Sequence, residues 1–148
     1  MGGLIEKLGE RVYLDASFFI YALEAIEPWV RVARRVAAAL DEGACSGVTS
    51  KLSLAECLEK PSELGRADLV RIYKAFFQER RFFSVVPITR DLVAEAARLR
   101  AISRLRLPDA IHAATALQRG CTSFLTYDDR LIIPGMKVLG WGDLSKKL

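Results

Sequence analysis

Short β-prone runs alternate with helical segments along the chain, and this alternation limits the possible folds more than any other feature. Strands joined by helical crossovers run parallel, whereas strands joined by tight turns run antiparallel. The pattern therefore predicts an α/β fold with a parallel sheet and helices on both of its faces. The predicted strands are 11–14, 44–48, 82–88, 122–126 and 137–139, and the predicted helices are 18–27, 28–42, 51–60, 62–80, 90–103 and 110–118.

Capping and helix-breaking residues set the expected boundaries of these elements. Thr49 or Ser50 can cap the helix that follows the second strand, and Thr89 can cap the helix that follows the third. Pro61 is expected to stop the first of these helices. Pro87 removes a backbone donor from the third strand, which is therefore predicted to lie at an edge of the sheet.

Length and composition favour one compact domain over residues 1–148. Hydrophobic residues make up 51% of the 148 residues and charged residues 27%, which excludes a disordered chain. No apolar run approaches the roughly 18 residues needed to span a bilayer, so a cytoplasmic protein with no membrane partner is expected. The three cysteines, Cys45, Cys57 and Cys121, lack metal-ligand spacing and are expected to be small buried residues in a reducing setting.

Four acidic residues stand where predicted strands end or helices begin: Asp15, Glu56, Asp109 and Asp128. Such positions converge at one edge of a parallel sheet, where α/β proteins bind their ligands. Carboxylates gathered there repel one another unless they take up protons or a cation. Oxygen ligands suit Mg²⁺ or Mn²⁺, and such ions serve the cleavage of phosphodiesters. The four acids therefore predict a metal-dependent site for phosphodiester hydrolysis.

Asp15 could be a simple helix cap, but Ser17 could cap the same helix. The residues alone leave the second and fourth acidic positions open. Glu59 shares nearly the same helix face as Glu56, and Asp129 is as good a candidate as its neighbour Asp128.

His112 and a run of arginines accompany the acids. His112 follows Asp109 by three residues on the same helix face, and it is interpreted as a packed residue that supports the site rather than as a ligand. The arginines that precede Asp109 can form a solvated helix face or can bind phosphates. Arg104 and Arg106, the arginines nearest Asp109, are the two predicted to bind RNA.

Four stretches of the chain together resemble the PIN-domain nucleases, and among them the VapC-type toxins. These stretches are Val12-Tyr13-Leu14-Asp15-Ala16-Ser17, Thr49-Ser50 leading to Glu56, Leu107-Pro108-Asp109-Ala110-Ile111-His112-Ala113-Ala114-Thr115-Ala116, and Phe124-Leu125-Thr126-Tyr127-Asp128.

The resemblance implies a three-layer α/β/α fold with a short-stranded central parallel sheet. It implies that Asp15, Glu56, Asp109 and Asp128 form an acidic pocket for Mg²⁺ or Mn²⁺, and so selects Glu56 over Glu59 and Asp128 over Asp129. Ser17 and Thr126 match positions where a hydroxyl lies near that pocket. The resemblance further implies an endoribonuclease that pairs with an antitoxin and forms a homodimer. Residues 1–10 form an N-terminal extension relative to typical toxins of this kind.

Two other classes of function are alternatives to this one. Phosphotransfer proteins share the expected sheet, but a phosphatase of the haloacid dehalogenase type needs Asp at position 17, where Ser17 stands. The remaining alternative is a non-catalytic PIN-like module for RNA binding or assembly, against which the intact acids argue.

Overall fold

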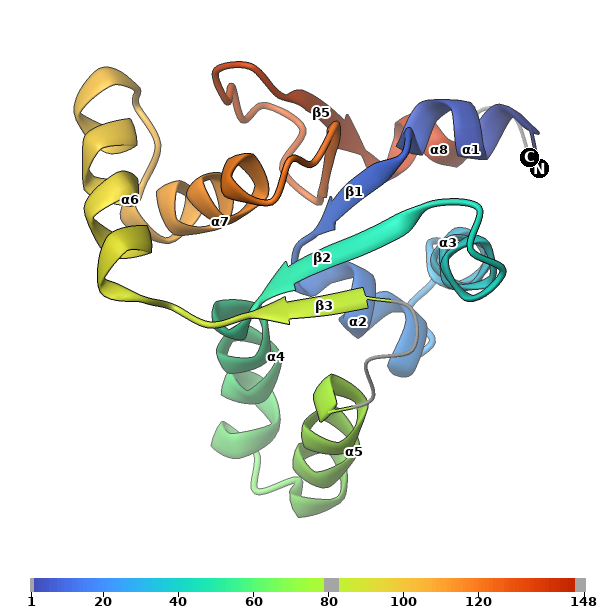
Figure 1. The fold of residues 1–148 in the computed structure, drawn as a ribbon. Coiled ribbons are helices and arrows are strands. Elements are labelled where there is room, and N and C mark those ends of the chain that lie inside the picture. The colour runs from blue at the N-terminus through green and yellow to red at the C-terminus, as the bar shows by residue number, and fades with distance from the viewer. Residues whose placement is uncertain (1, 79–82, 146–148) are drawn as a thin grey trace.

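A computed structural model of the chain describes residues 2–78 and 83–145 and contains a five-stranded parallel sheet (Figure 1). The strand order is β3-β2-β1-β4-β5, and every neighbouring pair is parallel. The strands are β1 (Arg11–Leu14), β2 (Ser46–Ser50), β3 (Phe83–Val86), β4 (Ser123–Thr126) and β5 (Lys137–Gly140). The predicted parallel α/β sheet is confirmed, and β3, which precedes Pro87, lies at its edge.

Helices connect these strands and cover both faces of the sheet. They are α1 (Gly2–Leu8), α2 (Ala16–Leu23), α3 (Val30–Asp41), α4 (Lys51–Glu63), α5 (Ala67–Gln78), α6 (Arg90–Ile102), α7 (Leu107–Gln118) and α8 (Trp141–Ser145). Ser50 caps α4 by accepting a hydrogen bond from the backbone of Leu52, and Thr89 caps α6 in the same way through Leu92. The hydroxyl caps expected from the sequence therefore begin both helices.

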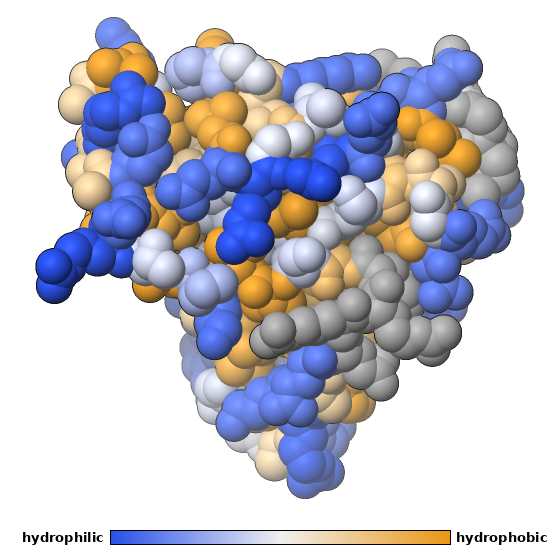
Figure 2. Space-filling view, viewed as in Figure 1, coloured by the Kyte–Doolittle hydropathy of each residue, from blue (hydrophilic) through white to orange (hydrophobic). Residues whose placement is uncertain are grey.

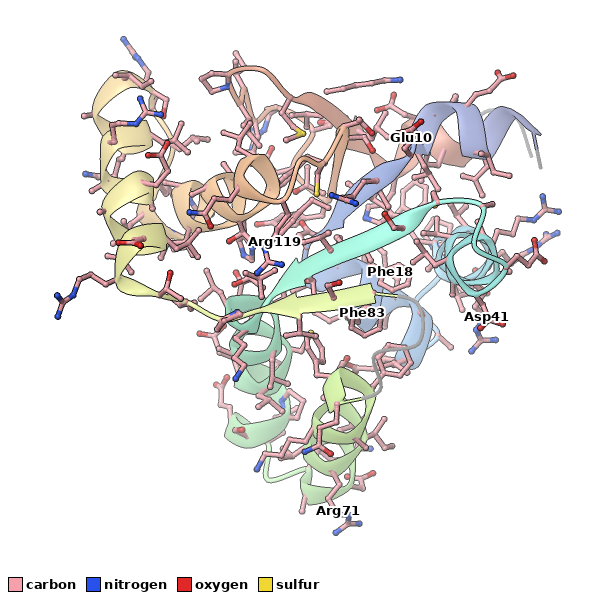
Figure 3. The ribbon with its side chains drawn as sticks, in the orientation of Figure 1. Glu10, Phe18, Asp41, Arg71, Phe83 and Arg119 are labelled. Carbon is pink, nitrogen blue, oxygen red and sulfur yellow. The ribbon has the colours of Figure 1, made fainter. Side chains whose placement is uncertain are left out.

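Alternation along β1 separates two hydrophobic cores, because successive side chains of a strand point to opposite faces. Val12 and Leu14 lie in the core that contains residues of α1, α2, α3 and α8, together with Phe18 and Phe83 (Figure 3). Tyr13 points to the other core, which is covered by α6 and α7. Helices on both sides of one sheet give the three-layer α/β/α arrangement (Figure 1).

The centre of the sheet contains a topological switch point. The chain runs outward from β1 through β2 to β3, and then returns to place β4 on the other side of β1. The backbone N–H of Asp15, just beyond β1, donates to the carbonyl of Leu125 in β4 (3.3 Å). Parallel sheets bind ligands beyond the carboxyl ends of strands at such a point, which places the expected site beside β1 and β4.

The structure corrects several expected boundaries. Pro61 does not stop α4 but lies in its last turn, where its missing N–H removes only one backbone bond, and the helix continues to Glu63. Helix α5 begins at Ala67 rather than at residue 62, and β3 is shorter than the predicted strand 82–88. Residues 79–82 lie outside the described part of the chain. Helices α1 and α8, of 7 and 5 residues, were not anticipated.

Helices α4 and α5 project from the body of the molecule, and Arg71 lies near their free end (Figures 1 and 3). Hydrophilic residues cover most of this projection, with hydrophobic residues visible between them (Figure 2). Leu64 and Ile72 are among its exposed apolar side chains. Within the described residues, every helix is too short or too polar to cross a membrane.

Gly47 occupies a position in β2 that has no room for a side chain. A Cβ there would lie 3.1 Å from the Cβ of Phe83 and 3.2 Å from methyl carbons of Leu14 and Leu40. We expect Gly47→Val to lower the free energy of unfolding by about 2 kcal/mol, because overpacked cores must shift to accept added methyl groups. Urea denaturation would measure the loss. Gly142→Ala is the matched control, because a Cβ on Gly142 meets nothing within 4 Å; an equal loss in both variants would contradict the prediction.

Candidate active site

A pocket of about 290 Å³ opens at the switch point, and all four predicted acids line it. We call it the acidic pocket. Asp15 follows β1, Asp128 follows β4, Glu56 comes from α4 and Asp109 from the first turn of α7. Glu59 and Asp129, the alternatives that the sequence left open, are exposed and do not line it. Distant segments of the chain therefore bring four carboxylates to one place.

Asp15 is the most buried of these acids, with 7% of its surface exposed. It is the N-cap of α2, and its Oδ1 accepts a hydrogen bond from the backbone N–H of Ser17 (2.9 Å). Its Oδ2 accepts from the backbone N–H of Tyr127 at 3.3 Å. Burial raises the pKa of Asp15, although hydrogen bonds from Ser17 and Thr126 oppose the rise. A positive charge beside Asp15 would therefore relieve an unfavourable buried carboxylate.

Ser17 connects Asp15 to the C-terminal helix α8. The Ser17 hydroxyl donates to Asp15 Oδ1 and accepts a hydrogen bond from Trp141 Nε1 (2.8 Å). Trp141 is buried, so the indole holds the hydroxyl in a fixed orientation. The predicted proximity of the Ser17 hydroxyl to the pocket is observed, and Trp141 is a supporting residue that the sequence did not reveal.

Glu56 is held by a hydrogen-bonded chain that passes through His112. His112 Nε2 lies 2.6 Å from Glu56 Oε1, and His112 Nδ1 lies 2.5 Å from the Tyr13 hydroxyl. A carboxylate oxygen accepts, so Nε2 is the nitrogen that donates to Glu56. Burial raises the pKa of Tyr13 well above its usual value, so the phenol keeps its proton and can donate to Nδ1. His112 therefore bridges Tyr13 and Glu56.

Arginines accompany the other two acids. Arg106 Nε lies 3.2 Å from Asp109 Oδ2, and Arg130 Nε lies 3.0 Å from Asp128 Oδ1. Hydrogen bonds from Arg130 hold the pKa of Asp128 below its usual range. Both arginine side chains are largely exposed, at 73% and 87%, whereas the acids they contact are mostly covered. The pocket thus has an acidic floor and a basic rim.

The donor set suits a hard divalent cation, because it consists of carboxylate oxygens. Among the described residues, no group of three or more His, Cys, Asp or Glu side chains is close enough to hold a metal ion. Each acid instead has its own partner: Asp15 has Ser17, Glu56 has His112, Asp109 has Arg106 and Asp128 has Arg130. The oxygen chemistry of these four side chains fits Mg²⁺ or Mn²⁺.

Sequence reasoning missed several residues around the pocket. Tyr127 and Leu131 line it beside Asp128, and Arg130 approaches from the same loop. Arg104, which was expected near the acids, lines an adjoining pocket of about 440 Å³ that also contains Arg106 and Arg130. Tyr127 lies between Thr126 and Asp128, which were both predicted to lie at the pocket, and this position could have indicated that Tyr127 lines the pocket too.

Several solved structures share this fold. VapBC2 from Rickettsia felis, solved with a promoter DNA fragment, has a TM-score of 0.70 at 14% identity over 88% of this chain and 98% of that one. FitAcB from Neisseria gonorrhoeae has a TM-score of 0.67 at 18% identity, over 88% and 98% of the two chains. VapC20 from Mycobacterium tuberculosis, a toxin that cleaves the sarcin–ricin loop, has a TM-score of 0.63 at 18% identity, over 76% and 86%.

The sequence itself carries a family match. No curated protein matches the chain. The PIN domain matches residues 12–134, a span that runs from β1 past β4 and contains all four acids of the pocket. The match covers most of the chain. A PIN domain is consistent with the three-layer parallel architecture of this chain and with the folds of the solved structures. The chain belongs to the PIN domain family.

Proposed function

We propose that the protein is a metal-dependent endoribonuclease that hydrolyses RNA phosphodiesters at the acidic pocket. The observation that carries this proposal is the convergence of Asp15, Glu56, Asp109 and Asp128, from four separate elements, on one pocket at the switch point of the sheet. Membership of the PIN domain family and the resemblance to VapC-type structures support it.

Some residues of the site are proposed to bind the metal, and others to hold those ligands in place. Asp15 and Asp109 are the proposed metal ligands, and Glu56 and Asp128 bind the ion directly or through water. A Mg²⁺ or Mn²⁺ ion held by these residues would supply an activated water as the nucleophile and positive charge for the phosphate and leaving oxygen. Ser17, Thr126 and His112 hold the carboxylates in place. The buried position of Asp15 fixes one ligand before any ion arrives.

Arg104 and Arg106 are the proposed contacts to the RNA backbone. Both are exposed at the rim of the adjoining pocket, where guanidinium groups can pair with phosphate oxygens. A net charge of +4 at pH 7 is compatible with a polyanionic substrate.

The biological role we propose is that of a cytoplasmic toxin with a cognate antitoxin. A solved structure from Klebsiella pneumoniae that shares this fold is a toxin–antitoxin complex, and this likeness supports a similar partner here. An antitoxin arginine that entered the acidic pocket would neutralise its carboxylates. A homodimer is part of the same proposal.

Metal dependence is the decisive test of this function. Purified protein incubated with total RNA is expected to cut it in Mg²⁺ or Mn²⁺ and not in EDTA, and mapping of the new ends would identify the target. Metal at about 100 times its dissociation constant is expected to raise the melting temperature by roughly 5–10 °C, because ligands stabilise the state they bind.

The outcomes separate the proposal from its alternative. RNA cleavage that persists unchanged in EDTA would rule out the metal-dependent mechanism. RNA binding without any Mn²⁺ binding in calorimetry would favour a non-catalytic PIN-like module for RNA binding or assembly.

A further inference from the structure

Tyr127 stands out on the surface beside the acidic pocket. It is 66% exposed, and it is the one aromatic among the strongly exposed large hydrophobic side chains of residues 2–78 and 83–145. Its ring stacks on no other ring in this part of the chain, in contrast to the buried pair Tyr13 and Phe124. The proposed nuclease chemistry makes no use of this side chain.

The backbone of Tyr127 is nevertheless fixed to the site. Its N–H donates to Asp15 Oδ2 (3.3 Å), and the residue joins Thr126 at the end of β4 to Asp128. Tyr127 lines both the acidic pocket and the adjoining pocket of about 440 Å³. Tyr127 therefore lies where the two pockets meet, with its backbone fixed to Asp15 and its side chain largely exposed.

Three arginines, Arg104, Arg106 and Arg130, line that second hollow together with Tyr127, and we call it the arginine pocket. Asp109 and Asp128 also line it, so the arginines outnumber the acids by one. Arg106 and Arg130 each reach an acid through Nε, and their exposed side chains leave further guanidinium N–H groups toward solvent. An exposed aromatic ring flanked by arginines is the arrangement that binds unpaired nucleotides, because the base stacks and the phosphate pairs with guanidinium.

We propose that Tyr127 is a stacking platform for one unpaired nucleobase of the RNA, and that the arginine pocket holds the adjoining phosphate. This proposal rests on the proposed ribonuclease function and assigns to Tyr127 a contact with a base of the substrate. A base inside a duplex is already stacked on both sides, so it cannot lie on the Tyr127 ring without being extruded. Every base has a π face, so the platform selects strandedness and tolerates different bases.

The test compares two strands that share a phosphate backbone. Fluorescence anisotropy in EDTA measures binding of a labelled single-stranded RNA and of an abasic strand of the same length. Wild-type protein is expected to prefer the base-containing strand by about 10-fold, within the range of base–aromatic stacking. Tyr127→Ala is expected to lose most of this preference and to bind the abasic strand as the wild type does. Tyr127→Phe keeps the ring and is expected to keep the preference.

Ile132→Ala is the matched control, because Ile132 is 82% exposed on the same loop and lines neither pocket. A 2-aminopurine strand gives a second signal, since its fluorescence should fall on binding to the wild type and Tyr127→Phe but not to Tyr127→Ala. An unchanged preference for bases in Tyr127→Ala would overturn the platform. Failure of the proposed function has a different signature, because the protein would then bind RNA without cutting it in Mg²⁺ or Mn²⁺.

Discussion

Replacing Asp15 by asparagine is expected to lower metal-dependent RNA cleavage by at least about 1,000-fold. Asp15 is the one acid of the pocket that is almost completely buried and fixed by several hydrogen bonds. Asparagine has nearly the same shape but no charge, so it removes the anchor for the cation. Loss of several kcal/mol of transition-state stabilisation corresponds to a rate loss of this size.

The same substitution is expected to stabilise the protein when no metal is added. Burial raises the pKa of Asp15 above its ordinary value of 3.8, so the folded chain binds this proton more tightly than the unfolded chain does. The stability gained from this proton is fully present at pH values below the pKa of Asp15 in the unfolded chain. It is lost as the pH rises through the pKa of Asp15 in the folded chain. At neutral pH the wild type carries the full penalty, and Asp15→Asn should raise the free energy of unfolding.

Urea denaturation in EDTA at several pH values, together with cleavage assays in Mn²⁺, would measure both effects. The stability advantage of Asp15→Asn should shrink as the pH approaches 3.8, where the wild-type carboxyl is itself protonated. Asp91→Asn is the matched control, because Asp91 is an exposed aspartate in the first turn of α6, outside the pocket. A variant that cleaves RNA in Mn²⁺ as fast as the wild type would show that Asp15 is not a metal ligand. A variant that is destabilised at neutral pH would contradict the burial penalty, because asparagine caps a helix as well as aspartate does.

Much of this site could be predicted from local sequence signals. Asp15 follows a run of apolar residues that must be a buried strand, and the crossover pattern requires the strands to be parallel. Together these two facts place Asp15 at the ligand-binding edge of the sheet. The caps at Ser50 and Thr89 were likewise predictable, because a hydroxyl directly before a helical segment satisfies its first free N–H groups.

The residues that hold the acids in place through hydrogen bonds could not be predicted, because these bonds depend on contacts between distant segments. Trp141 reaches Ser17 across 124 positions in sequence, from a helix too short to show any periodicity. Tyr13 looks like an ordinary strand residue, and only the packing of α7 against the sheet brings His112 to its hydroxyl. The ion pairs could not be predicted either, since the sequence pattern singled out Arg104 and Arg106 as RNA contacts and did not single out Arg130.

A second large effect is expected from removing the imidazole that links Tyr13 to Glu56. His112→Ala opens a cavity and leaves the buried Tyr13 hydroxyl without its imidazole partner, so the free energy of unfolding should fall by about 2–4 kcal/mol. Glu56 would lose the hydrogen bond that orients its carboxylate. Cleavage by the protein that remains folded should fall by roughly 10- to 100-fold, as for other residues that orient metal ligands.

A double-mutant cycle separates positioning from simple loss of fold. If His112 acts through Glu56, then His112→Ala in a Glu56→Gln background should cost little additional activity, because the carboxylate that it orients is already gone. Tyr13→Phe is the milder comparison, since it removes the hydroxyl but leaves Nε2 able to donate to Glu56. Activity losses that simply multiply in the double variant, measured at a temperature where every protein is folded, would refute the positioning role. The imidazole would then belong to the packing between the sheet and α7, and Glu56 would be oriented by the backbone of α4 alone.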